Sequence, residues 1–320
     1  MQNSNVEIVT LSEPVTTWQS KVDDIEEPFS MIYDADEWGN PPLAQMNRFD
    51  TRMVLNEADR LMECNGRLSA LDVGTGPGRI AMKLAQRDGA RVTALDATRG
   101  YLELVAKTAQ RIRLDPDSLT LVEAPIEEFT YEEGLGGPYD LITAIFGVLN
   151  HVENWQETLQ AFYDNLNPGG SFVSSIYGTN EARVYRMRSN NELPYKPSLV
   201  QTRVDGGIRL GEGEEVLPAK FPSIREFRQA LEEIGFEVEV IQGFLDFAAC
   251  FPSETTDENI AEYKALIQAE CPDLFERIES LQDPRVILIE VVEFEREYAL
   301  EPNNLGDFAY VGFVARKRKL

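Results

Sequence analysis

The chain has 320 residues, of which 43% are hydrophobic and 27% are charged, a balance typical of a globular protein with a sizeable core. Its 55 Asp and Glu residues outnumber its 30 Lys and Arg residues, which gives a formal net charge of −25. Such a surface disfavours binding to nucleic acid, because the phosphate backbone is repelled unless a local basic patch compensates. The same acidity, with only eight lysines, also fits a protein adapted to high salt, in which the charge reflects the solvent.

The sequence gives no signal for a membrane or for an oxidising compartment. No run of about 18 apolar residues predicts a membrane-spanning helix, and the start, MQNSNVEIVTLSEP, lacks the features of a signal peptide. Cys64, Cys250 and Cys271 are far apart and form no CxxC pair, so we expect reduced thiols in a cytoplasmic protein. Because His151 is the single histidine, no His/Cys metal site is expected.

Residues 1–64 are expected to form an N-terminal helical lid segment. A polar lead runs to about Glu27, and apolar or small residues then recur at helical spacing from about Asn47 to Cys64. Tyr33 is a candidate to close over a cofactor, and Arg48 is a candidate to pair with a carboxylate. A surface or packing role is the alternative for each of these two residues.

Apolar strands and amphipathic helices then alternate along the chain. The expected strands are residues 67–74, 90–97, 118–124, 139–147 and 171–178, and the expected helices are residues 78–89, 100–114 and 155–166. Strands that are apolar almost throughout, with helices between them, predict a parallel sheet covered on both faces.

The alternation breaks in two insertions. Residues 179–222 contain Asp205-Gly206-Gly207 between short β-prone runs, which predicts a hairpin. Ser223 and Glu226 form a capping box for a helix over residues 223–235, and a strand is expected over residues 236–244. Residues 245–305 are expected to form a helical insertion before a closing strand over residues 307–318. Within that insertion, one helical face carries the following residues: Ile287, Val291, Phe294 and Tyr298.

The stretch LDVGTGPGRIA places Gly74, Gly76 and Gly78 just after an apolar strand. A sharp turn from strand to helix needs residues that accept unusual backbone angles and leave bare backbone near a ligand. The spacing is GxGxG, whereas the dinucleotide fingerprint is GxGxxG, so a pyrophosphate site is disfavoured. We expect Gly78 to let the following helix pack tightly on the sheet.

Asp96 ends the second strand, 22 residues after Gly74. A carboxylate in this place can accept hydrogen bonds from both vicinal hydroxyls of a ribose. The alternative is that Asp96 caps the helix that opens at DATRG.

At this point the chain resembles the class I S-adenosylmethionine-dependent methyltransferases. The resemblance covers about residues 65–180 and is carried by LDVGTGPGRIA, ALDAT, VEAPIEEF, YDLITAIFGVLNHVEN and LNPGG. GFEVEVIQGF and AYVGFVARKR resemble the family's last two strands, which form an antiparallel pair. The resemblance implies one Rossmann-like α/β domain over residues 1–320, with a doubly wound, mostly parallel seven-stranded sheet and an antiparallel last strand. The hairpin-containing insertion would follow strand 5, and the helical insertion would lie between strands 6 and 7.

The resemblance implies S-adenosylmethionine as the methyl donor and S-adenosylhomocysteine as the product. Glu123 occupies the place of an Asp that often faces the adenine amine, and the amide of Ala124 would meet the ring. Phe146 would lie beside the sulfonium, while Ile126 would pack on the adenine or belong to the ordinary core. With Tyr33 and Arg48, the expected cofactor-binding residues are Asp72, Gly74, Thr75, Gly76, Gly78, Asp96, Ala97, Glu123, Ala124 and Phe146.

Methyl transfer from a sulfonium mainly requires orientation of the acceptor and exclusion of water, and the sequence shows no catalytic triad. His151 is the candidate general base or acceptor ligand, and a histidine tied to the backbone is the alternative. Asn150 is a weaker candidate of the same kind.

The absence of NPPY, DPPY and Pro-Cys motifs favours N or O of a small molecule as the acceptor. An RNA or protein methyltransferase, an NAD(P)-dependent oxidoreductase and a non-catalytic nucleoside-binding module are the alternatives. The 179–222 insertion would shape the acceptor pocket or form a solvated excursion, and the 245–305 insertion is a possible homodimer contact.

Overall fold

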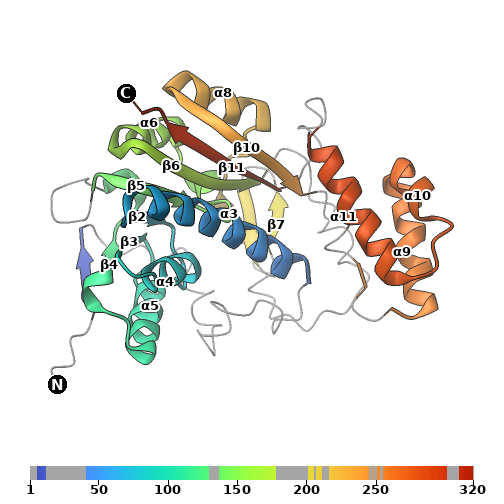
Figure 1. Cartoon of the computed structure of the whole chain (residues 1–320), viewed down its shortest axis with the longest axis horizontal. Coiled ribbons are helices and arrows are strands. Elements are labelled where there is room, and N and C mark those ends of the chain that lie inside the picture. Colours follow the sequence, from blue (N-terminus) through green and yellow to red (C-terminus); the bar gives the residue numbers. More distant parts are fainter. Residues whose placement is uncertain are drawn as a thin grey trace.

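The computed structural model describes residues 6–11, 41–129, 137–177, 201–204, 207–210, 216–244, 247, 251–252, 255–300 and 310–319. Its centre is an eight-stranded sheet in the order β1-β4-β3-β2-β5-β6-β11-β10 (Figure 1). The strands are β1 (Ile8–Thr10), β2 (Leu68–Val73), β3 (Ala90–Asp96), β4 (Leu119–Glu123), β5 (Tyr139–Ala144), β6 (Leu166–Tyr177), β10 (Phe236–Phe244) and β11 (Tyr310–Lys317). The pairs from β1 to β6 are parallel, and β11 is antiparallel to both β6 and β10.

Helices cover both faces of this sheet, as the apolar strands predict. On one face lie α3 (Pro41–Asn65), α4 (Arg79–Ala85) and α5 (Arg99–Ile112), whose apolar side chains share one core with the strands. On the other face lie α6 (Trp155–Asn165) and α8 (Ile224–Ile234), in a second core. In the described ranges, three short 3₁₀ helices connect strands and helices: η2 (Pro116–Ser118), η3 (Ile126–Glu128) and η4 (Val148–His151).

The mostly parallel α/β sheet with an antiparallel end is confirmed, but the expected number of strands is wrong. The eighth strand, β1, lies in the polar lead, where no strand was expected, and extends the sheet beyond β4. The backbone amide of Leu11 and the hydroxyl of Thr10 both bond to Glu123, so β1 covers what would be an unpaired edge. Strand β6 also begins earlier than expected and includes the Asn167–Gly170 turn.

The two insertions contain their own secondary structure. Strands β7 (Gln201–Val204), β8 (Gly207–Leu210) and β9 (Val216–Pro218) form a separate antiparallel sheet, with Val204 paired to Gly207. Between β10 and β11 lie α9 (Asp257–Glu270), α10 (Pro272–Ile278) and α11 (Pro284–Leu300), gathered beside one end of the sheet (Figure 1). The helical reading of residues 285–300 is confirmed, with Ile287, Val291 and Phe294 buried, and the capping box of Ser223 and Glu226 is present. In the described ranges, no helix is both long and apolar enough to cross a bilayer.

Helix α3 starts at Pro41, six residues before the expected start, and is a core helix in its described part. Val54, Ala58 and Leu61 are buried against the sheet. The lid expected for residues 1–64 stays a prediction, because residues 12–40 lie outside the described residues.

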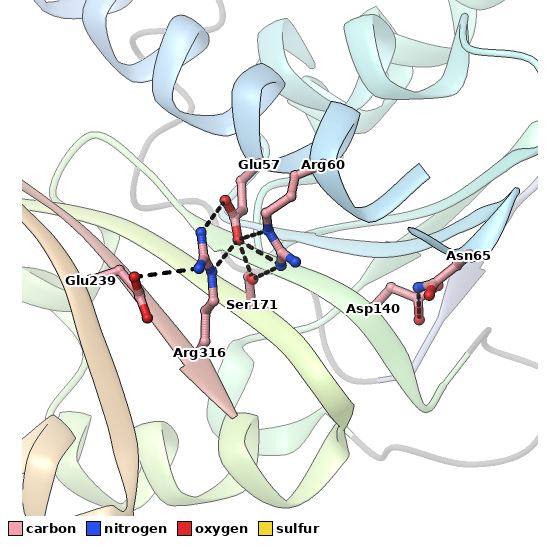
Figure 2. Close-up of polar contacts among 7 residues, drawn as sticks. All are labelled: Glu57, Arg60, Asn65, Asp140, Ser171, Glu239 and Arg316. Atoms are coloured by element: carbon pink, nitrogen blue, oxygen red, sulfur yellow. Dashed lines mark hydrogen bonds and ion pairs between the residues drawn. The ribbon is translucent and has the colours of Figure 1, made fainter. Parts of the chain in front are cut away.

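A network of charged side chains fastens the second half of α3 to the sheet (Figure 2). Glu57 is buried, and its Oε1 accepts hydrogen bonds from Ser171 Oγ (2.6 Å), Arg60 Nε (2.8 Å) and Arg316 Nε (2.9 Å). Burial raises the pKa of Glu57, but the hydrogen bonds from Arg316, Arg60 and Ser171 outweigh it and lower the pKa overall. The network therefore joins α3 to β6 and β11 through one ionised carboxylate.

We expect Glu57→Ala to lower the free energy of unfolding by about 2 kcal/mol at pH 7, because hydrogen bonds to a buried charge are lost. Since the folded pKa is lowered, the contribution of Glu57 is present above its ordinary pKa and is lost as the pH falls below about 4.5. Urea unfolding at pH 7 and pH 4 measures both effects. The control is Arg228→Ala, which breaks an exposed pair with Glu232 and should change stability by less than about 0.5 kcal/mol. A Glu57→Ala effect no larger than the control's would contradict this account of how α3 is held.

Candidate active site

Except for Tyr33 and Arg48, the expected site residues lie at or after the carboxyl ends of β2, β3, β4 and β5. In the sheet, β2 stands between β3, which follows it in the chain, and β5, which the chain reaches only after crossing back (Figure 1). Open α/β sheets bind ligands in the crevice outside the carboxyl ends of two such strands. The glycine turn (residues 74–78) follows β2, and residues 145–151 follow β5, so both segments flank this crevice.

All three glycines of the turn have a positive φ, and Gly76 and Gly78 serve different purposes. At Gly76, with φ of +52°, an added Cβ would meet nothing within 4 Å, so the turn presents bare backbone to open space. At Gly78, with φ of +87°, a Cβ would lie 2.7 Å from Val105 Cγ2. The close packing expected at Gly78 is therefore against α5 and not against the sheet.

Asp72, the second-last residue of β2, is buried and braces the turn. Its Oδ1 accepts from Thr143 Oγ1 of β5 (2.6 Å), and its Oδ2 accepts from Thr75 Oγ1 (2.7 Å) and the amide of Ala81 (3.1 Å). Burial raises the pKa of Asp72, and these hydrogen bonds oppose the rise. Both carboxylate oxygens have protein partners, so the geometry supports a role in shaping the turn. Thr75, also buried, donates its amide to Leu95 O at 3.0 Å.

Asp96 links the end of β3 to the glycine turn. Its Oδ2 accepts from the amide of Gly76 and its Oδ1 from the amide of Thr98, each at 2.8 Å. Burial raises the pKa of Asp96 to about 6, against the lowering effect of the Thr98 and Gly76 amides. Its alternative role as a helix cap is wrong, because α5 begins at Arg99 and its N-cap is Thr98. Ala97, between Asp96 and Thr98 in the chain, is half-buried.

Glu123, at the end of β4, lies opposite Asp96 in the sheet. Its Oε2 accepts from Arg99 Nη1 (2.7 Å) and Thr10 Oγ1 (2.9 Å). Its buried Oε1 has no hydrogen-bond partner among the described residues, so this oxygen can accept one more donor. The amide of Ala124 donates to Asp96 O at 3.1 Å, so the amide that the resemblance assigns to the adenine ring is engaged in the sheet. Ile126 is partly buried and packs against the core of the α6 face.

Phe146 follows β5 and has φ of +69°, a left-handed conformation that is rare for residues other than glycine. Its amide donates to Ser175 Oγ at 2.8 Å. Its ring is half-buried, with the centroids of Tyr177 and Tyr310 each 6.0 Å away. In this backbone turn after β5, the aromatic ring packs beside the rings of β6 and β11.

His151 ends η4, and its Nδ1 lies 3.1 Å from Pro218 O. A hydrogen bond of this kind fixes which ring nitrogen of a histidine carries the proton. It fits both a general base and a histidine that is tied to the backbone. Asn150 is structural: its amide nitrogen donates to Tyr177 O and Lys220 O, and its oxygen accepts from the Tyr177 amide. It therefore fastens η4 to β6.

The remaining candidates are placed less directly. Arg48 lies on α3 with an exposed side chain, while Tyr33 falls outside the described residues. Of the 179–222 insertion, residues 179–200 are likewise outside them. Among the described residues, no group of three or more His, Cys, Asp or Glu residues could hold a metal ion.

The structure also adds polar residues that the sequence analysis missed. Asp50 of α3 is fully buried, and Tyr310 Oη of β11 donates to its Oδ2 at 2.5 Å. Arg79, at the start of α4, donates to Asn47 O and Thr51 Oγ1 of α3. The available signal was the position of Asp50 four residues before Val54, on the apolar face of the expected helix. Nothing in the sequence indicates its pairing with β11.

Comparison with known proteins agrees with this geometry. Residues 70–170 match a family model described as a methyltransferase domain. The release factor glutamine methyltransferase of Chlorobaculum tepidum is 36% identical over 103 residues, 30% of this chain and 35% of that protein. The ubiquinone/menaquinone biosynthesis C-methyltransferase UbiE of Rickettsia akari is 29% identical over 175 residues, 52% of this chain and 67% of that protein. The chain thus spans about a third of the first relative and two thirds of the second.

Among solved structures, phosphoethanolamine N-methyltransferase 2 of Haemonchus contortus, in complex with S-adenosyl-L-methionine, is 15% identical with a TM-score of 0.44. The match covers 82% of this chain and 52% of that one, and a likeness of this size carries no argument about function. The family model, the strand order and the glycine turn joined to Asp96 carry the assignment. Residues 70–170 of this chain are thus a methyltransferase domain, similar to those of the class I S-adenosylmethionine-dependent methyltransferases.

Proposed function

We propose that this protein transfers a methyl group from S-adenosylmethionine to nitrogen or oxygen of a small molecule. The observation that carries the proposal is the Asp96 carboxylate, held at 2.8 Å from the amide of Gly76 where the turn is open. Each carboxylate oxygen has two acceptor sites, so Asp96 can keep its two backbone donors and still accept two ribose hydroxyls. No phosphate is needed at this turn, in keeping with its GxGxG spacing.

Two other features fit an adenosine with a sulfonium side chain. The unpartnered Oε1 of Glu123 is a suitable acceptor for an exocyclic amine, as Glu123 lies beside Asp96 in the sheet. The ring of Phe146 is suited to a sulfonium, because the face of an aromatic ring attracts cations. Asp72 and Thr75 hold the turn in place, and the roles of Ala97 and Arg48 in cofactor binding remain part of this proposal.

When bound, S-adenosylmethionine supplies a methyl group that is already activated on sulfur. The residues of this chain then need to orient the acceptor in line with the departing sulfur and exclude water. The rigid strand ends and the fixed Phe146 turn serve orientation. We assign to His151 the removal of a proton from the acceptor, with Nδ1 oriented by the carbonyl of Pro218.

The acceptor is proposed at the level of chemistry only. One relative is named as a release factor glutamine methyltransferase and the other as a C-methyltransferase of ubiquinone/menaquinone biosynthesis. The matched region therefore serves acceptors of different kinds. The net charge of −25 favours a small molecule over RNA. A protein acceptor would be detected as methylation of added polypeptide in a screen for methyl transfer.

We expect calorimetry to show binding of S-adenosylmethionine and S-adenosylhomocysteine to the wild type. Asp96→Ala should weaken both by about a hundredfold, because two hydrogen bonds to a charged acceptor contribute about 3 kcal/mol. Asp117→Ala, which removes an exposed carboxylate from η2, is the control and should bind as the wild type does. The proposed function is wrong if the wild type binds neither ligand at low or high salt. A folded Asp96→Ala protein with wild-type affinity would contradict only the ribose assignment.

Affinity for S-adenosylhomocysteine should fall about tenfold between pH 7 and pH 5, the loss of ionised carboxyl expected for a pKa of about 6. The sign follows from the raised pKa, since the protonated carboxyl formed at low pH no longer accepts hydrogen bonds on both oxygens. Groups near Asp96 include the carboxylate of Asp72 and the hydroxyl of Tyr101. Asp96→Asn should remove this pH dependence, and titrations at four pH values compare the two proteins. An unchanged slope in Asp96→Asn would assign the effect to another group.

The role of His151 is tested with His151→Asn, whose side-chain amide can still donate to Pro218 O. Once a screen of metabolite pools has found an acceptor, turnover should fall about a hundredfold, a typical effect of losing a general base. Binding of S-adenosylmethionine should not change. Turnover close to that of the wild type would show that His151 only ties η4 to β9.

A further inference from the structure

A chain of hydrogen bonds runs from Phe146 to the buried carboxylate of Asp50. The amide of Phe146 donates to Ser175 Oγ (2.8 Å), Ser175 Oγ lies 2.5 Å from Tyr310 Oη, and Tyr310 Oη donates to Asp50 Oδ2 (2.5 Å). Because the Tyr310 proton is directed at Asp50, the serine hydroxyl is left to donate to Tyr310. The chain therefore has one direction, from the turn after β5 through β6 and β11 to α3.

An ionised Asp50 at this position costs folding stability. It is fully buried, and burial raises its pKa to about 6, against the effects of Arg79, Tyr310 and Ser175. Arg79 Nη2 lies 3.7 Å from Oδ2, while Oδ1 has no hydrogen-bond partner among the described residues. A carboxylate in this state is poor support for stability, since an apolar residue often stabilises such a site better. Helix α3 is in any case fastened to the sheet by Glu57.

The other end of the chain is a strained backbone. Phe146 and Arg113 are the non-glycine residues with positive φ in the described ranges, and Arg113 is an exposed C-cap. Backbone strain of this kind persists only where the surroundings impose it, and it concentrates at functional sites. The Ser175 hydroxyl, held in turn by Tyr310, is the hydrogen-bond partner of the strained residue's amide.

We propose that Asp50 is a positioning residue for methyl transfer: through Tyr310 and Ser175 it holds Phe146 in the left-handed conformation that sets its ring at the donor site. The proposal rests on the proposed function, because it takes Phe146 to face the sulfonium. Ring packing alone does not explain the arrangement. Phe146, Tyr177 and Tyr310 pack with ring centroids 5.4–6.0 Å apart, and those contacts need no hydroxyl on Tyr310 and no charge on Asp50.

The test compares affinity for S-adenosylmethionine with affinity for S-adenosylhomocysteine, because the two differ in the methyl group and the positive charge on sulfur. Tyr310→Phe keeps the ring and removes the hydroxyl. It should weaken binding of S-adenosylmethionine by about tenfold, the order of a lost contact between a cation and an aromatic face. Binding of S-adenosylhomocysteine should change by less than about threefold, since it carries no charge on sulfur. The matched control is Tyr139→Phe, which removes a buried hydroxyl bonded to Thr93 at the opposite end of β5 and should leave both affinities unchanged.

Substitutions of Asp50 separate the hydrogen bond from the charge. Asp50→Asn retains an oxygen that can accept from Tyr310 and should keep the ratio of the two affinities within about threefold of the wild type. Asp50→Leu has no acceptor and should lose selectivity as Tyr310→Phe does. If Tyr310→Phe fails to fold, Ser175→Ala tests the same chain at its other end, with the same selective loss expected.

Each remaining result overturns the proposal. An unchanged ratio in Tyr310→Phe and Ser175→Ala would show that the chain does not position Phe146, and equal loss of both ligands would show a merely structural role. Loss of selectivity in Asp50→Asn would assign the effect to charge. If the wild type binds neither ligand, the proposed function itself fails, which is a result distinct from these three.

Discussion

The arrangement of the site depends on the hydrogen bonds that the carboxylate of Asp72 accepts. It accepts from Thr143 of β5, from Thr75 in the glycine turn and from the amide of Ala81 in the first turn of α4. The N-cap of α4 is Gly78, which has no side chain to satisfy the free amides of the helix start. A glycine is needed there because of its backbone angles and the closeness of Val105, so the cap must come from a distance. Asp72 supplies it and, by fixing the turn, directs the amide of Gly76 at Asp96.

Helix α3 carries two buried carboxylates with opposite pKa shifts. Glu57 is fully bonded and its pKa is lowered, whereas Asp50, two turns earlier and beside the site, has its pKa raised to about 6. A raised pKa means that the folded state binds the proton more tightly, so stability is lost as the pH rises from about 4 to about 6. For Asp50 and Asp96 this loss is on the order of 3 kcal/mol each at neutral pH. Glu57, in the half of α3 away from the site, therefore contributes to stability at neutral pH, whereas Asp50, in the half at the site, lowers it.

The local parts of the site could be predicted from the sequence, and the distant pairings could not. Periodicity and glycine spacing are local signals, which is why the strands from β2 to β6, the glycine turn and Asp96 were expected where they occur. Strand β1 has three residues and pairs with residues more than 100 positions away, so no local pattern indicates it. The bond between Tyr310 and Asp50 joins residues 260 positions apart. The sequence did not indicate that the amide of Ala124 donates to Asp96 O, because the hydrogen-bond ladder between β3 and β4 continues one residue past β4.

The same contrast explains why the donor is easier to infer than the acceptor. Apart from Arg48, the residues proposed to hold the donor, from Asp72 to Phe146, lie within residues 70–170, the part that matches the methyltransferase family model. The three-stranded sheet β7–β9 and the helices α9–α11 lie outside that match. His151, inside the matched region, takes its orienting bond from Pro218 of β9, outside it. The residue we assign to the acceptor is thus set by an element the family model does not cover, so relatives that share the donor half can differ in what they methylate.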